Sequence, residues 1–113
     1  MIGATEVLKH LRAVVVVKGA DYVYPGTGPC HYVVNGKPAC IVAYVYDRLG
    51  LLDQFTRESG AAAWNLHVDR ITLVGRDLLT VAQMVQDGAP IDGIRRGTWG
   101  EALAAAETVG GAL

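Results

Sequence analysis

Apolar residues in the segment 4–18 recur at spacings of three and four, which is the pattern of a helix with one buried face. Thr5 is placed to cap this helix and Gly19 to end it. Four consecutive valines form helices poorly, so a strand over residues 13–17 is the competing interpretation. We favour the helix, because the spacing continues through the valines. The predicted face consists of Val7, Leu8, Leu11, Val14, Val15 and Lys18.

Residues 31–39, with the sequence HYVVNGKPA, have the pattern of a small β-hairpin. Asn35-Gly36 is the strongest short turn signal, because both central residues of a type I′ turn need a positive φ. This turn sets the register of the hairpin and places Val34 opposite Lys37.

A second helix is predicted over residues 39–49, directly after the hairpin. Pro38 cannot donate to a strand ladder, so it closes the hairpin and starts the helix, where proline is well tolerated. Gly50 is the expected stop. The apolar face of this helix consists of Ile41, Val42, Val45 and Leu49.

The middle of the chain is read less easily. Residues 51–59 predict a short helix, and residues 61–77 hold apolar residues at mixed spacing that fit a short strand or a loop. Residues 78–88 predict a further helix that ends in a glycine. Thr80 and Gln83 have the spacing of a capping box at its start.

Residues 98–109 carry the clearest helix start in the chain. Thr98 is the expected cap, Glu101 reaches back to it, and Trp99 is expected in the core with Trp64. Together the segments predict an α+β fold, a mostly helical single domain over residues 1–113 with one small β-hairpin.

Composition adds an expectation about the surface. The chain has 113 residues, of which 51% are hydrophobic and 19% are charged. This length fits one domain with an ample core. The charged fraction lies below the roughly 25% of a typical domain, so apolar groups remain exposed. A protein partner or a second copy of the chain, as in a homodimer, would cover them.

Charge argues against a nucleic-acid-binding protein. The formal net charge is -1, whereas phosphate neutralisation needs clustered lysine and arginine. The densest basic group is Arg95-Arg96, which leaves a DNA-linked regulator as a weaker hypothesis. The glycines do not form a phosphate-binding loop.

No apolar run approaches the length of a membrane span. The run 13–17 is also too short for a signal peptide, and no small-residue cleavage site follows it. We therefore expect a cytoplasmic protein that does not engage a membrane. Cysteines held as thiols suit that compartment.

The two cysteines allow several kinds of chemistry. In the predicted register Cys40 faces His31, while Cys30 falls opposite Ile41. Neighbouring strand positions point to opposite faces, so the register disfavours a disulfide. A zinc site built from Cys30, Cys40 and His67, with or without His31, has suitable ligand types but lacks the close pairs of structural zinc sites. We expect no metal and no cofactor.

The sharpest enzymatic hypothesis uses Cys40 as a nucleophile or thiol sensor. A thiolate near a helix start is stabilised by exposed N–H groups, and His31 would be close enough to act as a base. Cysteine more often packs as a small hydrophobic residue, which is the interpretation we favour for both cysteines. His67 and Asp69 could pair as an oriented base, but no nucleophilic serine motif accompanies them.

The stretch CHYVVNGKPACIV, followed by LG and later by TWGEALAAAE, resembles a loose group of small uncharacterised proteins. They occur in mycobacteria, related actinobacteria and the bacteriophages that infect them. The matching pieces are residues 30–50 and 97–107. The resemblance implies a bacterial cytoplasm or an infected host cell, and it transfers no catalytic residue. The connector over residues 89–97 is longer here, so the packing of the last helix is left open.

Two functional hypotheses follow from the sequence. The first is a small non-enzymatic interaction protein, which could be a phage accessory protein that binds a bacterial host protein. The second is a cysteine-dependent enzyme or thiol sensor that uses Cys40 and His31. We favour the first, because a helix-rich, apolar and weakly charged chain carries no complete catalytic set.

Overall fold

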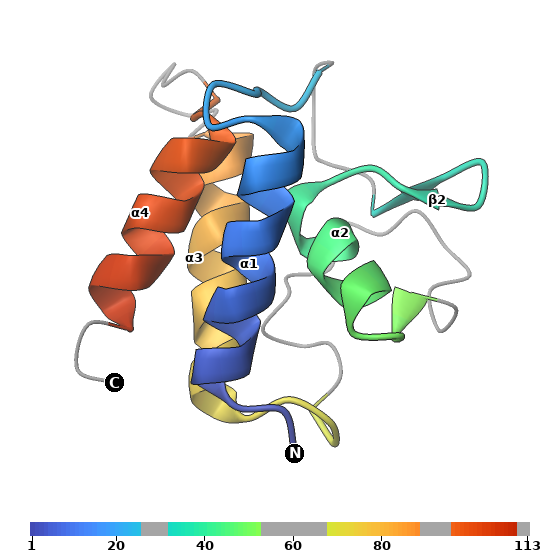
Figure 1. The fold of residues 1–113 in the computed structure, drawn as a ribbon, viewed down its shortest axis with the longest axis vertical. Helices are drawn as coiled ribbons and strands as arrows, with labels where there is room; N and C mark the ends of the chain where they lie inside the picture. The colour runs from blue at the N-terminus through green and yellow to red at the C-terminus, as the bar shows by residue number, and fades with distance from the viewer. Residues whose placement is uncertain (26–31, 53–67, 89–95, 111–113) are drawn as a thin grey trace.

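The fold is mostly helical, and the computed structural model describes residues 1–25, 32–52, 68–88 and 96–110 of it. In Figure 1 the first helix stands beside the last two, and the hairpin and the short helix that follows it lie on the other side of the first helix. The predicted α+β class with one small hairpin is confirmed. The elements are α1 (Ala4–Lys18), β1 (Val33–Val34), β2 (Lys37–Pro38), α2 (Ile41–Arg48), α3 (Leu73–Asp87) and α4 (Trp99–Val109).

Helix α1 has the bounds that its apolar spacing predicts, but its cap differs. Gly3 is the N-cap, in an extended conformation and without a side-chain cap hydrogen bond. Thr5 lies within the first turn, so the prediction that it caps the helix is wrong. Gly19 ends the helix at a φ of 97°, and its N–H donates to the Val15 carbonyl at 2.7 Å.

The valine run belongs to α1, and the strand interpretation of residues 13–17 is wrong. Val14 and Val15 are buried, whereas Val16 and Val17 point to solvent. The helix tolerates these β-branched residues because its other face is buried against α2, α3 and α4.

The hairpin has the predicted turn and register. Asn35 and Gly36 both have positive φ, at 53° and 76°, as a type I′ turn requires. Beyond the paired strand residues, the Ala39 N–H donates to the Tyr32 carbonyl at 2.9 Å. The paired residues are Val33 with Pro38 and Val34 with Lys37.

Helix α2 starts later than the sequence predicts. Pro38 is still paired in the hairpin, and Cys40 is the extended N-cap, with a φ of -102°. Ile41 is therefore the first helical residue, and the prediction that Pro38 starts the helix is wrong. The predicted stop is confirmed, because Gly50 follows the helix with a φ of 75°.

Helix α3 begins well before the predicted segment 78–88. Thr72 is its N-cap and accepts a hydrogen bond from the Gly75 N–H at 3.2 Å. Thr80 lies inside the helix, where its hydroxyl donates to the Arg76 carbonyl, so the capping box predicted at Thr80 and Gln83 is wrong. The helix ends at the predicted glycine, Gly88.

Helix α4 has the predicted capping box. The Glu101 N–H donates to the Thr98 hydroxyl at 3.1 Å, and the Glu101 carboxylate accepts from the Thr98 N–H at 2.9 Å. At Gly100 the helix start meets the turn after α1, where a Cβ atom would come within 2.8 Å of the Ala20 carbonyl. Only glycine fits so close an approach.

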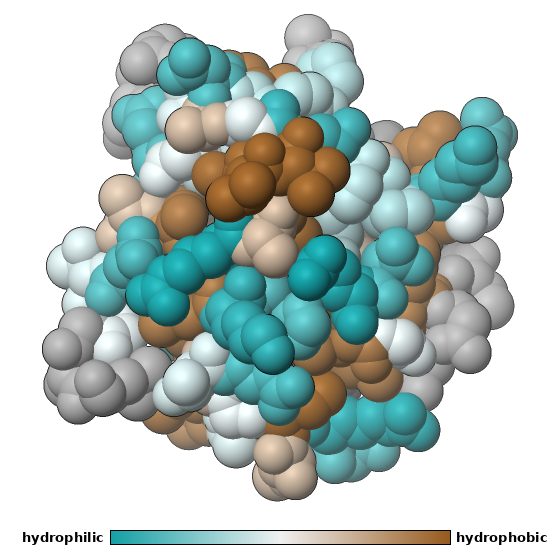
Figure 2. All heavy atoms as spheres, in the orientation of Figure 1, coloured by the Kyte–Doolittle hydropathy of each residue, from teal (hydrophilic) through white to brown (hydrophobic). Residues whose placement is uncertain are grey.

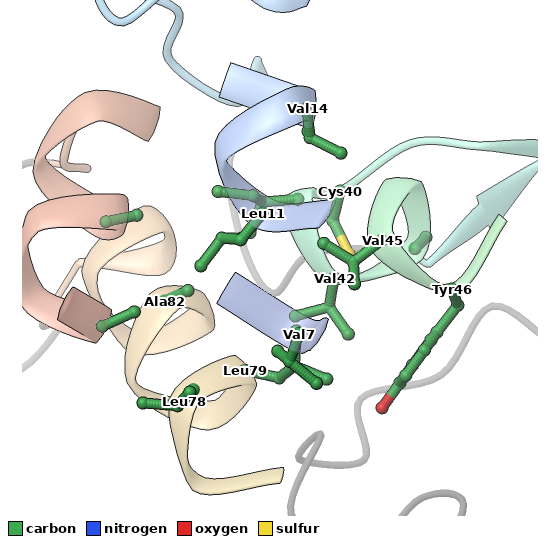
Figure 3. Packing of buried hydrophobic residues seen from close by; sticks show 14 of the residues in the cluster. Val7, Leu11, Val14, Cys40, Val42, Val45, Tyr46, Leu78, Leu79 and Ala82 are labelled. Carbon is green, nitrogen blue, oxygen red and sulfur yellow. The ribbon is translucent and has the colours of Figure 1, made fainter. Parts of the chain in front are cut away.

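The described residues share one hydrophobic core between the four helices (Figure 3). Trp99, Tyr32, Tyr46, Leu11 and Ile41 are among its largest fully buried side chains. The chain start is tied to this core by hydrogen bonds of 2.8 Å and 2.9 Å that join Ile2 to the backbone on both sides of Ile71.

Several predictions lie outside the described residues. They concern the helix over 51–59 for nearly all of its length, the core position of Trp64, and most of the connector over 89–97. None of the helices that the structure describes is long and apolar enough to cross a membrane.

Candidate functional site

Cys40, the residue of the enzymatic hypothesis, is fully buried. It is the N-cap of α2, but its side chain makes no cap hydrogen bond. Figure 3 shows its sulfur atom directed toward Val45 and Val42 of α2, within the core. Apolar surroundings disfavour the charged thiolate that attacks a substrate or binds a metal. Its proposed partner His31 lies outside the described residues, as does Cys30.

Tyr46 lies close enough to Cys40 to be influenced by it. Burial raises the pKa of the Tyr46 hydroxyl strongly, the neighbouring Cys40 raises it further, and Arg76 opposes the rise. The cause is desolvation, which penalises the charged form of any acid placed here. These surroundings make the region suited to packing rather than to proton transfer at neutral pH.

The predicted zinc ligands cannot be assembled from the described residues. Cys40 is the described member of that set, since Cys30, His31 and His67 all lie outside the described ranges. Within those ranges, no three histidine, cysteine or acidic side chains gather at one point. Asp69 is exposed, and its partner in the predicted pair is His67.

Two buried glutamines of α3 hold the hairpin and α2 in place. The Gln86 side-chain oxygen accepts from the Ile41 N–H at 2.8 Å, at the start of α2. The Gln83 side-chain oxygen accepts from the Tyr32 hydroxyl at 2.8 Å, at the start of the hairpin. The sequence analysis missed both roles. The sequence does carry a signal for these two roles. Gln83 and Gln86 are polar residues that continue the helical spacing of the buried Leu79 and Ala82.

Arg96, one of the two arginines in the weaker DNA hypothesis, is engaged within the fold. Its Nη1 lies 3.7 Å from the Asp87 carboxylate, and its guanidinium lies 5.2 Å from the centre of the Tyr24 ring. Arg95 lies outside the described residues. A largely buried guanidinium that contacts a carboxylate and a ring is poorly placed to neutralise a phosphate.

An aromatic cluster surrounds the start of α4. Trp99 is fully buried, and the rings of Tyr22 and Tyr44 meet it edge to face at centre distances of 4.6 Å and 5.6 Å. The Lys18 ammonium lies 5.0 Å and 4.9 Å from the centres of the two tyrosine rings. A hydrogen bond with Tyr44 raises the pKa of Lys18, which favours the charged form of the ammonium beside the two rings.

A polar contact joins α1 to the end of α2. Arg48 Nε donates to His10 Nδ1 at 3.1 Å, and the other ring nitrogen of His10 lies 3.9 Å from the Glu6 carboxylate. Burial lowers the pKa of His10, Arg48 and Lys9 lower it further, and Glu6 opposes them. His10 is therefore set to act as a neutral acceptor.

The clearest surface feature is an apolar patch at the end of α1. We call Val16 and Val17, together with the half-buried Ala13 one turn before Val16, the α1 patch. Val16 is 82% exposed and Val17 is 77% exposed. In Figure 2 apolar side chains form a brown area on the upper middle of the visible face, above a group of polar side chains. Beside it, Arg12 on α1 pairs with Glu107 on α4 at 3.0 Å.

Comparison with known protein families, with curated protein sequences and with solved structures finds no match for this chain.

Proposed function

We propose that this chain is a small non-enzymatic interaction protein, which binds a protein partner through the α1 patch. The observation that carries the proposal is the exposure of Val16 and Val17 side by side on a well-formed helix. Valine is a poor helix former, so at an exposed position it stabilises neither the helix nor the core. A contact with another protein would give these two side chains a physical role.

The placement of the other candidate residues supports the same function. Cys40 is sealed in the core, and Arg96 is held by Asp87 and Tyr24. Neither residue offers a reactive or charged group to a small substrate or a phosphate chain. In the proposed setting the partner is a protein of the bacterial cytoplasm, and it is a host protein if the chain is encoded by a bacteriophage.

The experiment compares capture of proteins from the native bacterium by three immobilised chains. They are the wild type, the double variant Val16→Glu/Val17→Glu, and the control Met84→Glu. Met84 is also apolar and 67% exposed, but it lies on α3. We expect a defined partner that the wild type and the control retain and the double variant loses. Equal capture by all three chains would show that the α1 patch does not bind it.

A further inference from the structure

The tip of the hairpin places an asparagine directly before a glycine. The hairpin projects from the helices in Figure 1, and Asn35 and Gly36 are both exposed. A Cβ atom added at Gly36 would meet nothing within 4 Å among the described residues, so the backbone nitrogen of Gly36 is open to attack or to movement. A bond from this nitrogen to Cγ of Asn35 would close an unstrained five-membered ring.

The reaction that this pair of residues allows is the loss of the side-chain amide of Asn35. The Gly36 N–H gives its proton to water, and the nitrogen forms a bond to Cγ of Asn35. The bond between Cγ and Nδ2 breaks, and the leaving nitrogen takes up a proton and departs as ammonia. Water then adds to either carbonyl of the succinimide and opens the ring, which yields aspartate or isoaspartate. Water is the co-reactant, and no atom is oxidised or reduced.

In the observed turn the two reacting atoms are held apart. Asn35 and Gly36 have φ values of 53° and 76°, and the first central residue of a type I′ turn has a ψ of about +30°. The ring closes only when the Gly36 nitrogen lies on the same side of the main chain as Cβ of Asn35. For an L-residue this needs a ψ of about −120°, which is the value at the same position of a type II′ turn.

A flip of one peptide unit converts the observed turn into the reacting one. Rotation of the unit between Asn35 and Gly36 changes ψ of Asn35, and it turns φ of Gly36 to about −80°. Glycine adopts both signs of φ, so Gly36 does not oppose the flip. Type I′ and type II′ turns both close a two-residue hairpin loop, so the pairing of Val33 with Pro38 persists.

The base of the hairpin is held independently of its tip. The Tyr32 hydroxyl donates to Gln83 on α3 at 2.8 Å, and the Ala39 N–H donates to the Tyr32 carbonyl at 2.9 Å. The reacting geometry is therefore reached while the protein stays folded. It is a minor state, because a residue with a side chain rarely combines a positive φ with this ψ.

We propose that Asn35 is a site of spontaneous deamidation, which proceeds from the folded protein through a flip of the Asn35–Gly36 peptide unit. The product carries a carboxylate at the hairpin tip, so the formal net charge of -1 becomes one unit more negative. Isoaspartate also adds a methylene group to the main chain, which a two-residue turn of type I′ does not accommodate. The hairpin tip therefore changes as the molecule ages, while the contacts of Tyr32 with the core remain.

The test follows the purified full chain at neutral pH and constant temperature over several weeks. Digestion and mass spectrometry measure the fraction of the hairpin peptide in which an amide has become a carboxylate. A synthetic peptide of residues 31–39 in the same buffer gives the rate of an unfolded chain. We expect the native rate to be at least about a hundredth of the peptide rate, because only a locally strained turn is required. A reaction through global unfolding would be slower than the peptide by about a thousandfold or more.

A second measurement separates the flip from unfolding. Urea well below the unfolding midpoint raises the unfolded fraction by about tenfold. The rate at Asn35 should stay the same, because the flip does not require the protein to unfold. The control variant Asn35→Gly keeps a Gly-Gly sequence that suits the same turn, and its hairpin peptide should gain no carboxylate.

Three outcomes would overturn the proposal. A native rate below about a hundredth of the peptide rate would show that the folded turn does not reach the reacting geometry. A rate that rises in proportion to the unfolded fraction would place the reaction in the unfolded chain. A mass gain that persists in the hairpin peptide of Asn35→Gly would show that Asn35 is not the modified residue.

Discussion

At the scale of single residues, the side-chain oxygen of Gln86 replaces the local cap that α2 lacks. Cys40 occupies the N-cap position but offers no side-chain acceptor to the backbone of the helix. Gln86 reaches across from α3 and accepts the Ile41 N–H instead. Both groups are buried, so water cannot serve as the acceptor in its place. The position of α2 therefore depends on one amide from another helix.

Replacement of Gln86 by leucine should destabilise the protein by about 1–3 kcal/mol, the cost of a buried N–H left without an acceptor. Met84→Leu on the same helix is the control and should change stability by about 0.5 kcal/mol or less, because Met84 is exposed. Urea unfolding measures both values. Hydrogen exchange at the Ile41 amide should also accelerate. Equal stability of the two variants would contradict a capping role for Gln86.

His10 makes stability depend on pH. Its pKa in the folded state is lowered from 6.5 by burial and by Arg48 and Lys9, so the unfolded chain binds the proton more readily. The stabilising contribution is therefore complete above pH 6.5 and is lost as the pH falls through the lowered pKa. Protonation also removes the acceptor that Arg48 uses.

We expect the unfolding free energy to fall more steeply between about pH 7 and about pH 5 in the wild type than in His10→Gln. Glutamine can still accept from Arg48 but does not titrate in this range. The other histidines, His31 and His67, are present in both proteins, so their contribution cancels in the difference. Parallel pH profiles of the wild type and His10→Gln would show that protonation of His10 does not affect stability.

At the scale of elements, the sequence predicted some of the helix and hairpin ends that depend on neighbouring residues. The Asn35-Gly36 turn and the Thr98–Glu101 capping box act over two to four residues, and both are confirmed. The start of α2 depends on how long the hairpin pairing continues and on Gln86, more than forty residues away along the chain. Local signals could not place it.

The start of α3 was missed for a different reason. Thr72 is a good N-cap, but the apolar residues that follow it, Leu73 and Val74, are exposed, so the helical spacing is hidden at this end. Thr80 and Gln83 have the right separation for a capping box, yet Gln83 faces the core and binds Tyr32. Gln83 can be buried because Tyr32, far away along the chain, is its hydrogen-bond partner. Such a partner exists only in the folded molecule, so neighbouring residues do not reveal it.

The capping box of α4 gives a prediction at this scale. Thr98→Ala should destabilise the protein by about 1 kcal/mol, because the Glu101 N–H loses its acceptor. Thr108→Ala is the matched control, since Thr108 is exposed and its hydroxyl only donates within the last turns of the same helix. It should change stability by about 0.5 kcal/mol or less. Thermal unfolding measures both variants. Equal melting temperatures of Thr98→Ala and Thr108→Ala would show that the Thr98 cap does not stabilise α4.

At the scale of the whole molecule, α1 has two different apolar surfaces. Val7, Leu11 and Val14 face the core, where they meet α2 and α3 (Figure 3). Val16 and Val17 face outward at the end of the same helix. Substitutions in the first group should therefore alter folding, and substitutions in the second should alter association while the fold persists. Because the two groups of residues lie on different faces of α1, binding by the α1 patch can be tested without disturbing the core.

Cys40 reports on opening of the whole molecule, because its side chain is fully buried in the core beside Val42 and Val45. The experiment uses a Cys30→Ser background, so that Cys40 is the cysteine that is labelled. Labelling of native Cys40 by a thiol reagent should be at least about a thousandfold slower than labelling of an exposed thiol. The reason is that the protein must first open, which costs several kcal/mol. The exposed reference is Ala104→Cys in a chain without the two native cysteines; Ala104 lies on the outer surface of α4. Urea below the unfolding midpoint should accelerate Cys40 labelling in proportion to the unfolded fraction. If Cys40 in the native protein reacts as fast as the reference thiol, its structural role is contradicted. That result would instead favour the hypothesis of a cysteine-dependent enzyme or thiol sensor.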